Sequence, residues 1–153
     1  MRLWGKLAQM TNNEYHIPVL FNESLDALQI ESDSVVVDVT YGGGGHSGEI
    51  LKRLGEDGAL LAFDQDDDAL ANVVEDERLF FANANFRFLV NFARYYDLMD
   101  ADAVLADLGV SSHQFDAGVR GFSIREEGEL DMRMNQNSEL TAYRVVNNYP
   151  EKE

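Results

Sequence analysis

The chain has 153 residues, a hydrophobic content of 45% and a formal net charge of −16 at pH 7. This length and composition allow one globular domain with a buried core, and no apolar run in the sequence is long enough to cross a membrane as a helix. The absence of cysteine excludes disulfides, thiolate metal sites and cysteine nucleophiles. So acidic a chain is expected to repel phosphate backbones, and any nucleic-acid function has to overcome that charge.

The first ten residues, MRLWGKLAQM, carry charges but no apolar segment behind them, which disfavours a secretory signal. The lack of cysteine agrees with a reducing compartment. We therefore expect a polar lead-in over residues 1–14, a domain over residues 15–153, a cytoplasmic location and no membrane association.

The first elements expected along the chain are a short helix and a buried strand. Residues 18–30 place Phe21, Leu25 and Leu28 at i, i+4 and i+7, which puts them on one face of a helix. The sequence SVVVDVT at 34–40 is a continuous, β-branched apolar run, which is typical of a strand buried on both faces. A glycine-rich stretch follows this strand directly.

Helices and strands then alternate at regular spacing. The expected elements are a helix at 46–55, a strand at 59–64, a helix at 66–76, a strand at 78–83, a helix at 86–97 and a strand at 101–107. This alternation predicts an α/β fold, with a doubly wound, mostly parallel sheet that has helices on both faces.

The pattern changes after Asp107. Residues 108–140 have no sustained period and predict a long, functionally placed loop, and residues 140–149 predict a helix. A sheet ending at the fourth strand would leave an apolar strand with an unpaired edge. We therefore expect the chain to be the first part of a longer, truncated protein.

The sequence DVTYGGGGHSGEI at 38–50 indicates a ligand site between the first strand and the next helix. Glycines there open the backbone to a ligand at a helix N-terminus. Gly43, Gly45 and Gly48 satisfy G-x-G-x-x-G, and Asp64, 21 residues after Gly43, ends the second strand, where a carboxylate can bind ribose hydroxyls. These features fit a dinucleotide or S-adenosylmethionine equally, while the alternative is a tight turn with Asp64 as a helix cap.

Three further residues are candidates at the same edge of the sheet. We expect His46 to contact a ligand rather than act as a base, and the alternative at a helix start is packing or a main-chain hydrogen bond. Phe86 either lies against an adenine or belongs to the core. Asp107 contacts the cofactor, accepts a hydrogen bond from a substrate amino group, or caps the next segment. Residues 66–68, all aspartates, predict an acidic first helical turn and no metal site.

Ordered motifs across the chain resemble the bacterial 16S ribosomal RNA cytosine-N4 methyltransferase family, which uses S-adenosylmethionine. The resemblance begins near residue 15, continues to the end of the chain and covers only the amino-terminal part of such an enzyme. The motifs are YHIPVL (15–20), VDVTYGGGGHS (37–47), AFDQDDDAL (62–70), LADLGVSSHQFD (105–116), RGFS (120–123) and LDMRM (130–134). Family members usually start close to Met10, so residues 1–9 are an extension or a misplaced start.

The resemblance implies a class I methyltransferase fold and methylation of a cytidine N4 amino group in 16S rRNA of the small ribosomal subunit. Carried onto matching positions, it implies that Asp64 binds the ribose, that Phe86 lies beside the adenine, and that Asp107 and Gln114 lie nearer the reacting end. The implied cofactor contacts are Gly44, Gly45, His46, Asp64, Phe86, Asp107 and Gln114.

The chemistry of the reaction points to Asp107 as the catalytic candidate. Cytosine N4 is a poor nucleophile because its lone pair is delocalised, so the site has to hold it in line with the methyl group. The cytosine also has to be unstacked from folded RNA. Many amino-methyltransferases place Pro-Pro-aromatic after the acidic or amide residue, whereas residues 108–110 are Leu-Gly-Val here. Ser111, Ser112 and His113 are therefore alternatives.

The loop after Asp107 contains arginines that either contact RNA phosphates or belong to a solvated surface of mixed charge. The arginines are Arg120, Arg125 and Arg133, and the acids around them are Glu126, Glu127, Glu129 and Asp131. Because the charges are balanced, we expect the solvated surface. Two alternatives to an active methyltransferase stay open: a dinucleotide-dependent oxidoreductase and a fragment that binds cofactor without catalysis.

Overall fold

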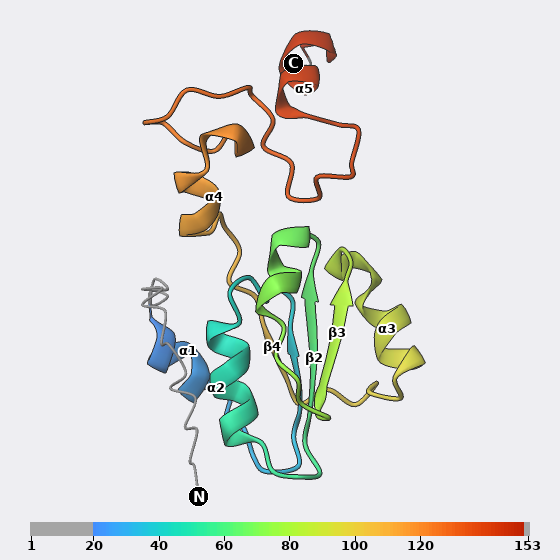
Figure 1. The fold of residues 1–153 in the computed structure, drawn as a ribbon. Coiled ribbons are helices and arrows are strands. Elements are labelled where there is room, and N and C mark those ends of the chain that lie inside the picture. Colours follow the sequence, from blue (N-terminus) through green and yellow to red (C-terminus); the bar gives the residue numbers. More distant parts are fainter. Residues whose placement is uncertain (1–19, 152–153) are drawn as a thin grey trace, which may run out of the picture.

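The computed structural model describes residues 20–151, so the predicted lead-in and the YHIPVL motif lie outside the described residues, apart from Leu20. A four-stranded sheet with every pairing parallel forms its centre, in the order β3-β2-β1-β4 (Figure 1). The strands are β1 (Val35–Asp38), β2 (Ala59–Asp64), β3 (Leu79–Asn83) and β4 (Ala103–Leu105). The predicted α/β fold with a doubly wound parallel sheet is confirmed.

Helices connect the strands and continue after them. The α-helices are α1 (Phe21–Ala27), α2 (Gly45–Arg53), α3 (Leu89–Tyr95), α4 (Ser112–Asp116) and α5 (Ala142–Asn148). Short 3-10 helices are η1 (Asp67–Asn72), η2 (Phe86–Phe88) and η3 (Gly118–Arg120). None of the helices in residues 20–151 is both long and apolar enough to span a membrane.

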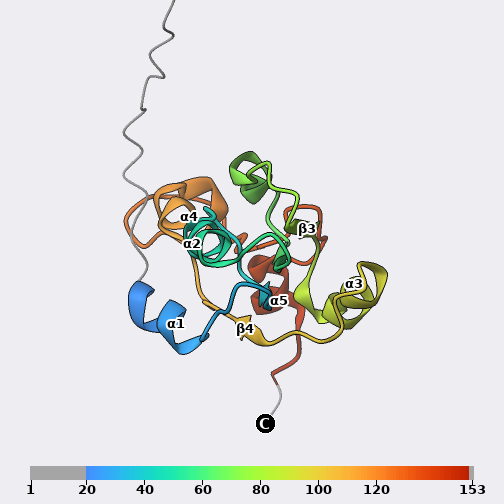
Figure 2. The same ribbon diagram turned by 90° about the horizontal axis from the view of Figure 1, so that it is seen from below.

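The two faces of the sheet are covered by different helices, as Figure 2 shows from below. Successive strand residues point to opposite faces, so the continuous apolar strands supply both cores. On one face Val36 and Leu60 join a cluster with α1 and α2. On the other face Val37 and Phe63 join a cluster with α3, where Phe63 meets Phe92 edge to face at a ring distance of 5.5 Å.

The predicted helix at 66–76 is wrong in type and length, because the structure has only the 3-10 helix η1 there. Two tertiary contacts account for this early end. The Tyr41 hydroxyl donates to the Asn72 carbonyl at 2.8 Å, and the Asn72 amide donates to the Gly42 carbonyl at 3.2 Å. The Asn72 carbonyl therefore bonds to the glycine loop instead of a following helical turn, and Val73 is extended.

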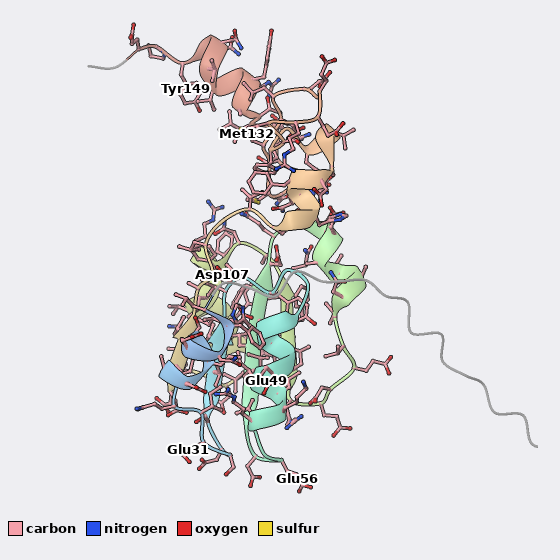
Figure 3. The ribbon with its side chains drawn as sticks, turned by 90° about the vertical axis from the view of Figure 1, so that its left-hand side faces the viewer. Glu31, Glu49, Glu56, Asp107, Met132 and Tyr149 are labelled. Carbon is pink, nitrogen blue, oxygen red and sulfur yellow. The ribbon has the colours of Figure 1, made fainter. Side chains whose placement is uncertain are left out.

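Two regions can be separated along the chain. The sheet body comprises residues 20–107, and the carboxyl-terminal segment comprises residues 108–151. Figure 1 shows this segment above the carboxyl ends of the strands, and Figure 3 shows Asp107 at the junction, with Met132 beyond it and Glu31 and Glu56 at the opposite end of the sheet. The predicted long loop at 108–140 is not without structure, since it contains α4 and η3.

Candidate functional site

The glycine loop adopts a backbone that side chains would obstruct. Gly42 and Gly44 have φ angles of 53° and 76°, in the left-handed region that favours glycine. A Cβ atom at Gly44 would lie 2.9 Å from the Tyr41 hydroxyl. Gly45 and Gly48 are different, because a Cβ atom at either position meets no described atom within 4 Å. The open space beside Gly45, at the first residue of α2, lies where a ligand can approach the helix N-terminus.

Asp64 is bonded directly to this loop. One of its carboxylate oxygens accepts from the Gly42 N–H at 2.8 Å, and the other accepts from the Asp66 N–H at 2.9 Å. Burial raises the pKa of Asp64, and these two N–H donors act in the opposite direction. Each oxygen keeps a further acceptor position, so Asp64 can still accept a hydrogen bond from a ligand hydroxyl.

A second acidic residue, Asp38, bonds to residues on both sides of the glycine loop, and it was not among the predicted site residues. Asp38 is completely buried and accepts hydrogen bonds from the Ser47 hydroxyl at 2.7 Å and the Thr40 N–H at 2.9 Å. The Thr40 hydroxyl in turn accepts from the Asp107 N–H at 2.8 Å. Burial raises the pKa of Asp38, opposed by these donors. An acid that ends an apolar strand four residues before a glycine run is the signal that could have identified it.

His46 is buried and presents an unused nitrogen. Its ring lies 5.0 Å from that of Phe21, centre to centre, at a tilt of 31°. Its Nε2 atom has no hydrogen-bond partner within residues 20–151. A buried polar atom without a partner is costly, so His46 is suited to the ligand contact predicted for it.

Phe86 begins η2 at the carboxyl end of β3, and it is not a core residue. Its side chain is 42% exposed, so the structure contradicts the core alternative. Asn83 and Asn85 hold this turn against the end of β2: the Asn83 amide donates to the Asp64 carbonyl at 3.2 Å and the Asn85 amide to the Gln65 side chain at 2.8 Å. Phe86 is therefore fixed near Asp64 with an exposed ring.

Gln114 lies in a buried polar cluster between the two regions. Its side-chain amide donates to Asp66 at 2.6 Å, and its side-chain carbonyl accepts from the Ser111 N–H at 3.0 Å. The Ser111 hydroxyl accepts from the Gln114 N–H at 3.2 Å, which completes a capping box for α4. These bonds fix the orientation of Gln114 at the carboxyl edge of the sheet.

The expectation of a solvated surface is wrong for Arg120. Its side chain is only 8% exposed, and its guanidinium bonds Asp66 and Asp68, each at 2.6 Å. Burial acts to raise the pKa of Asp66, but the hydrogen bonds from Arg120 and Gln114 outweigh it and lower that pKa. Asp66 is therefore a buried ionic partner as well as the cap of η1.

The remaining candidates whose side chains the structure describes lie on the surface of the carboxyl-terminal segment or where the sheet body meets it. Asp107 is exposed, and β4 ends two residues before it, earlier than predicted. His113 is exposed, with its Nε2 atom 3.7 Å from Asp68. The Ser112 side chain lies outside the described part of the structure. Arg133 pairs with Asp131 at 2.6 Å on a partly exposed surface, as expected for mixed charges.

Comparisons with known proteins identify the family. The model of the MraW methylase family matches residues 13–153. The chain belongs to this family. It is 58% identical over 143 residues to the ribosomal RNA small subunit methyltransferase H of Flavobacterium johnsoniae, covering 94% of this chain and 47% of that protein.

Further relatives carry the same name. The Bacteroides fragilis protein (strain ATCC 25285) is 59% identical over 138 residues, covering 90% of this chain and 45% of the relative. The protein of Flavobacterium psychrophilum is 53% identical over 132 residues, covering 86% of this chain and 45% of the relative. The chain therefore spans about half the length of the curated relatives that it matches.

Membership of the MraW methylase family confirms the resemblance deduced from the ordered motifs. The family is one of methylases and not of oxidoreductases, which favours the methyltransferase interpretation of the glycine spacing over the oxidoreductase interpretation. The sequence predicted that the glycine loop, Asp64 and Phe86 lie at one edge of the sheet, and the structure places them there. The sequence prediction left out Asp38 and Thr40 and assigned Arg120 to a solvated surface. The bonds of Thr40 to Asp107 and of Arg120 to Asp66 join residues distant in sequence, whereas Asp38 bonds to the nearby Thr40 and Ser47.

Proposed function

We propose that this chain forms the cofactor-binding part of an S-adenosylmethionine-dependent enzyme that methylates the N4 amino group of a cytidine in 16S rRNA of the small ribosomal subunit, in the cytoplasm. The observation that carries the proposal is the hydrogen bond between the Gly42 N–H and the Asp64 carboxylate, because it joins an open glycine loop to an acceptor for ribose hydroxyls. The names of the relatives, which are ribosomal RNA methyltransferases, support the substrate class.

Each predicted cofactor contact has a chemical role in this proposal. The backbone of Gly44 and Gly45 lies against the cofactor, where side chains are absent. His46 uses its unpartnered Nε2 atom, Asp64 accepts from the ribose, and the exposed ring of Phe86 packs on the adenine. Gln114 and Asp107 lie nearer the reacting end, with Gln114 oriented by its bonds to Asp66 and Ser111.

S-adenosylmethionine supplies an electrophilic methyl group on a sulfonium. The protein then has to hold the cytosine N4 atom in line with that group and accept a hydrogen bond from the amino group. Asp107 is our candidate for this acceptor, because its carboxylate is exposed at the carboxyl edge and its backbone is fixed by Thr40. By holding the amino group, Asp107 would direct the lone pair of the poorly nucleophilic N4 atom at the methyl carbon.

Isothermal titration calorimetry with S-adenosylmethionine tests the site with two matched glycine variants. Gly45 and Gly48 both have space for a Cβ atom, and neither has a positive φ angle. We expect Gly45→Ala to weaken binding at least about tenfold, because the added methyl blocks the cofactor, and Gly48→Ala to change it less than about twofold. Thermal unfolding checks that both variants stay folded. Absence of binding to the unmodified chain, or equal effects of the two variants, contradicts the proposal.

Catalysis is tested separately with isolated small ribosomal subunits and S-adenosylmethionine labelled in the methyl group. An active chain transfers label to a cytidine N4, and Asp107→Ala lowers the rate without lowering cofactor affinity in the same proportion. A fragment that binds cofactor without catalysis gives calorimetric binding but no label in RNA. NAD titration in the same buffer tests the oxidoreductase alternative, for which binding is expected to be absent.

A further inference from the structure

We propose that Arg120 is a positioning residue for the cofactor site: through Asp66 it fixes Asp64 at the glycine loop and holds the carboxyl-terminal segment over the carboxyl edge of the sheet. This inference rests on the proposed function, since it concerns the same site. It departs from the prediction that the arginines of this segment lie on a solvated surface. We call Asp66, Asp68, Gln114 and Arg120 the ionic clamp.

The planar, forked guanidinium of Arg120 donates hydrogen bonds to three residues at once. Its Nη2 atom donates to Asp66 at 2.6 Å and to the Arg133 carbonyl at 3.0 Å, and its Nη1 atom donates to Asp68 at 2.6 Å. Two carboxylates of one short turn and one carbonyl of the carboxyl-terminal segment therefore meet on a single planar group. Lysine cannot reproduce this fork, because its ammonium group is a point charge on a flexible stem.

A continuous series of hydrogen bonds leads from Arg120 to the glycine loop. Arg120 and Gln114 both donate to the same oxygen of Asp66. The Asp66 N–H donates to Asp64, and the other oxygen of Asp64 accepts from the Gly42 N–H. Fixing the Asp66 side chain consequently fixes the N–H that orients Asp64.

Electrostatics give Arg120 a second effect on Asp64. Residues 64–68 contain four aspartates. Burial is the main cause that raises the pKa of Asp64, and the like charge of the Asp66 carboxylate acts in the same direction. Arg120 offsets the charge of Asp66 at a direct contact of 2.6 Å. Its removal would leave Asp66 buried without a cationic partner next to the acceptor that the ribose needs, and a buried carboxylate without a partner is strongly disfavoured.

The main chain around Arg120 is tied to the same segment. The Met132 N–H donates to the Arg120 carbonyl at 3.0 Å. Gly121 follows with a φ angle of 75°, and a Cβ atom there would lie 2.5 Å from the Glu129 carbonyl oxygen. The side chain and the main chain of Arg120 thus bind Met132 and Arg133 on one side, and Asp66 and Asp68 at the start of η1 on the other. Arg120 therefore connects the two regions.

A double-mutant cycle on S-adenosylmethionine affinity separates positioning from general stability. The variants are Arg120→Gln, Asp64→Asn and the double variant, with Arg133→Gln as matched control because Arg133 lies in the same segment but pairs with a neighbouring surface acid. We expect Arg120→Gln to weaken binding about tenfold and Arg133→Gln less than about twofold. In the Asp64→Asn background the Arg120 substitution should cost at most about twofold more, because its effect acts through Asp64. Arg120→Lys, which retains the charge, should fold and show an intermediate loss.

Equal losses in both backgrounds would overturn the proposal, since they would show that Arg120 acts independently of Asp64. An affinity unchanged by Arg120→Gln would overturn it as well. If the unmodified chain does not bind S-adenosylmethionine, the proposed function fails, and the clamp is then judged by amide hydrogen exchange alone. Faster exchange at the Gly42 and Asp66 amides in Arg120→Lys supports the connection, and unchanged exchange at both contradicts it.

Discussion

The sheet body and the carboxyl-terminal segment are held together by different forces. Among the described residues, every buried hydrophobic side chain except Phe122 belongs to the sheet body. The carboxyl-terminal segment instead buries Gln114 and Arg120, while its apolar residues Val119 and Ile124 are 81% and 96% exposed. The first region is stabilised mainly by removal of apolar surface from water, and the second by directional polar bonds.

This difference has consequences for how each region should respond to change. Apolar burial depends on volume and contact and is insensitive to pH. A buried ion pair is sensitive to geometry and to protonation, because loss of one partner leaves the other without compensation. The two regions can therefore be destabilised separately, and three experiments make the distinction measurable.

The largest effect is expected from Phe63→Ala in the sheet body. Phe63 is fully buried and packs edge to face on Phe92, so truncation removes apolar contacts and leaves a cavity. We expect the free energy of unfolding to fall by about 4 kcal/mol, as measured by urea denaturation. Ile124→Ala is the control from the other region and should change it by less than about 0.5 kcal/mol. A comparable loss from both substitutions would remove the contrast between the regions.

The sheet body was the region that the sequence could predict. A strand that is buried on both faces is a short, continuous apolar run. Such a run can be recognised from the local sequence alone. The glycine loop and Asp64 were also predictable as neighbours, because the carboxyl ends of parallel strands share one edge. The bond from Gly42 to Asp64 agrees with that reasoning.

The ionic clamp could not be predicted in the same way. Arg120 is surrounded in sequence by acids, which indicates a solvated surface, yet its partners are Asp66 and Asp68 on a distant turn. No period or local spacing encodes a contact between residues so far apart. The 3-10 helix η1 was missed for a related reason, since its end is set by contacts from Tyr41 and Gly42 rather than by its own propensity.

An intermediate effect is expected from Gly121→Ala, which strains the main chain next to the clamp. The left-handed φ angle of 75° and the close Glu129 carbonyl both oppose a side chain there. We expect the free energy for opening residues 112–134 to fall by about 2 kcal/mol, as measured by amide hydrogen exchange, with the strands unaffected. Gly109→Ala, in the same segment but with open space around its Cβ position, should leave exchange unchanged. Equal exchange in the two variants would show that Gly121 does not constrain this segment.

The smallest effect is expected from acid, and its sign differs between the ionic clamp and the buried acids at the glycine loop. Burial acts to raise the pKa of Asp66, but the hydrogen bonds from Arg120 and Gln114 outweigh it and lower this pKa from its ordinary value of 3.8. Ionised Asp66 therefore stabilises the fold fully above pH 3.8, and this stabilisation is lost as the pH falls below 3.8. Burial raises the pKa of Asp38 and Asp64, so the folded sheet body takes up protons before the unfolded chain does and gains stability as the pH falls towards 3.8. A titration followed by two-dimensional amide NMR from pH 7 to pH 2 should therefore show shifts of Gln114 and Arg120 below about pH 4 while the strand signals persist. In Asp131→Asn, which removes the carboxylate that pairs with Arg133, these shifts should remain, because they report the clamp. Simultaneous loss of strand and segment signals would mean that the two regions unfold as one unit.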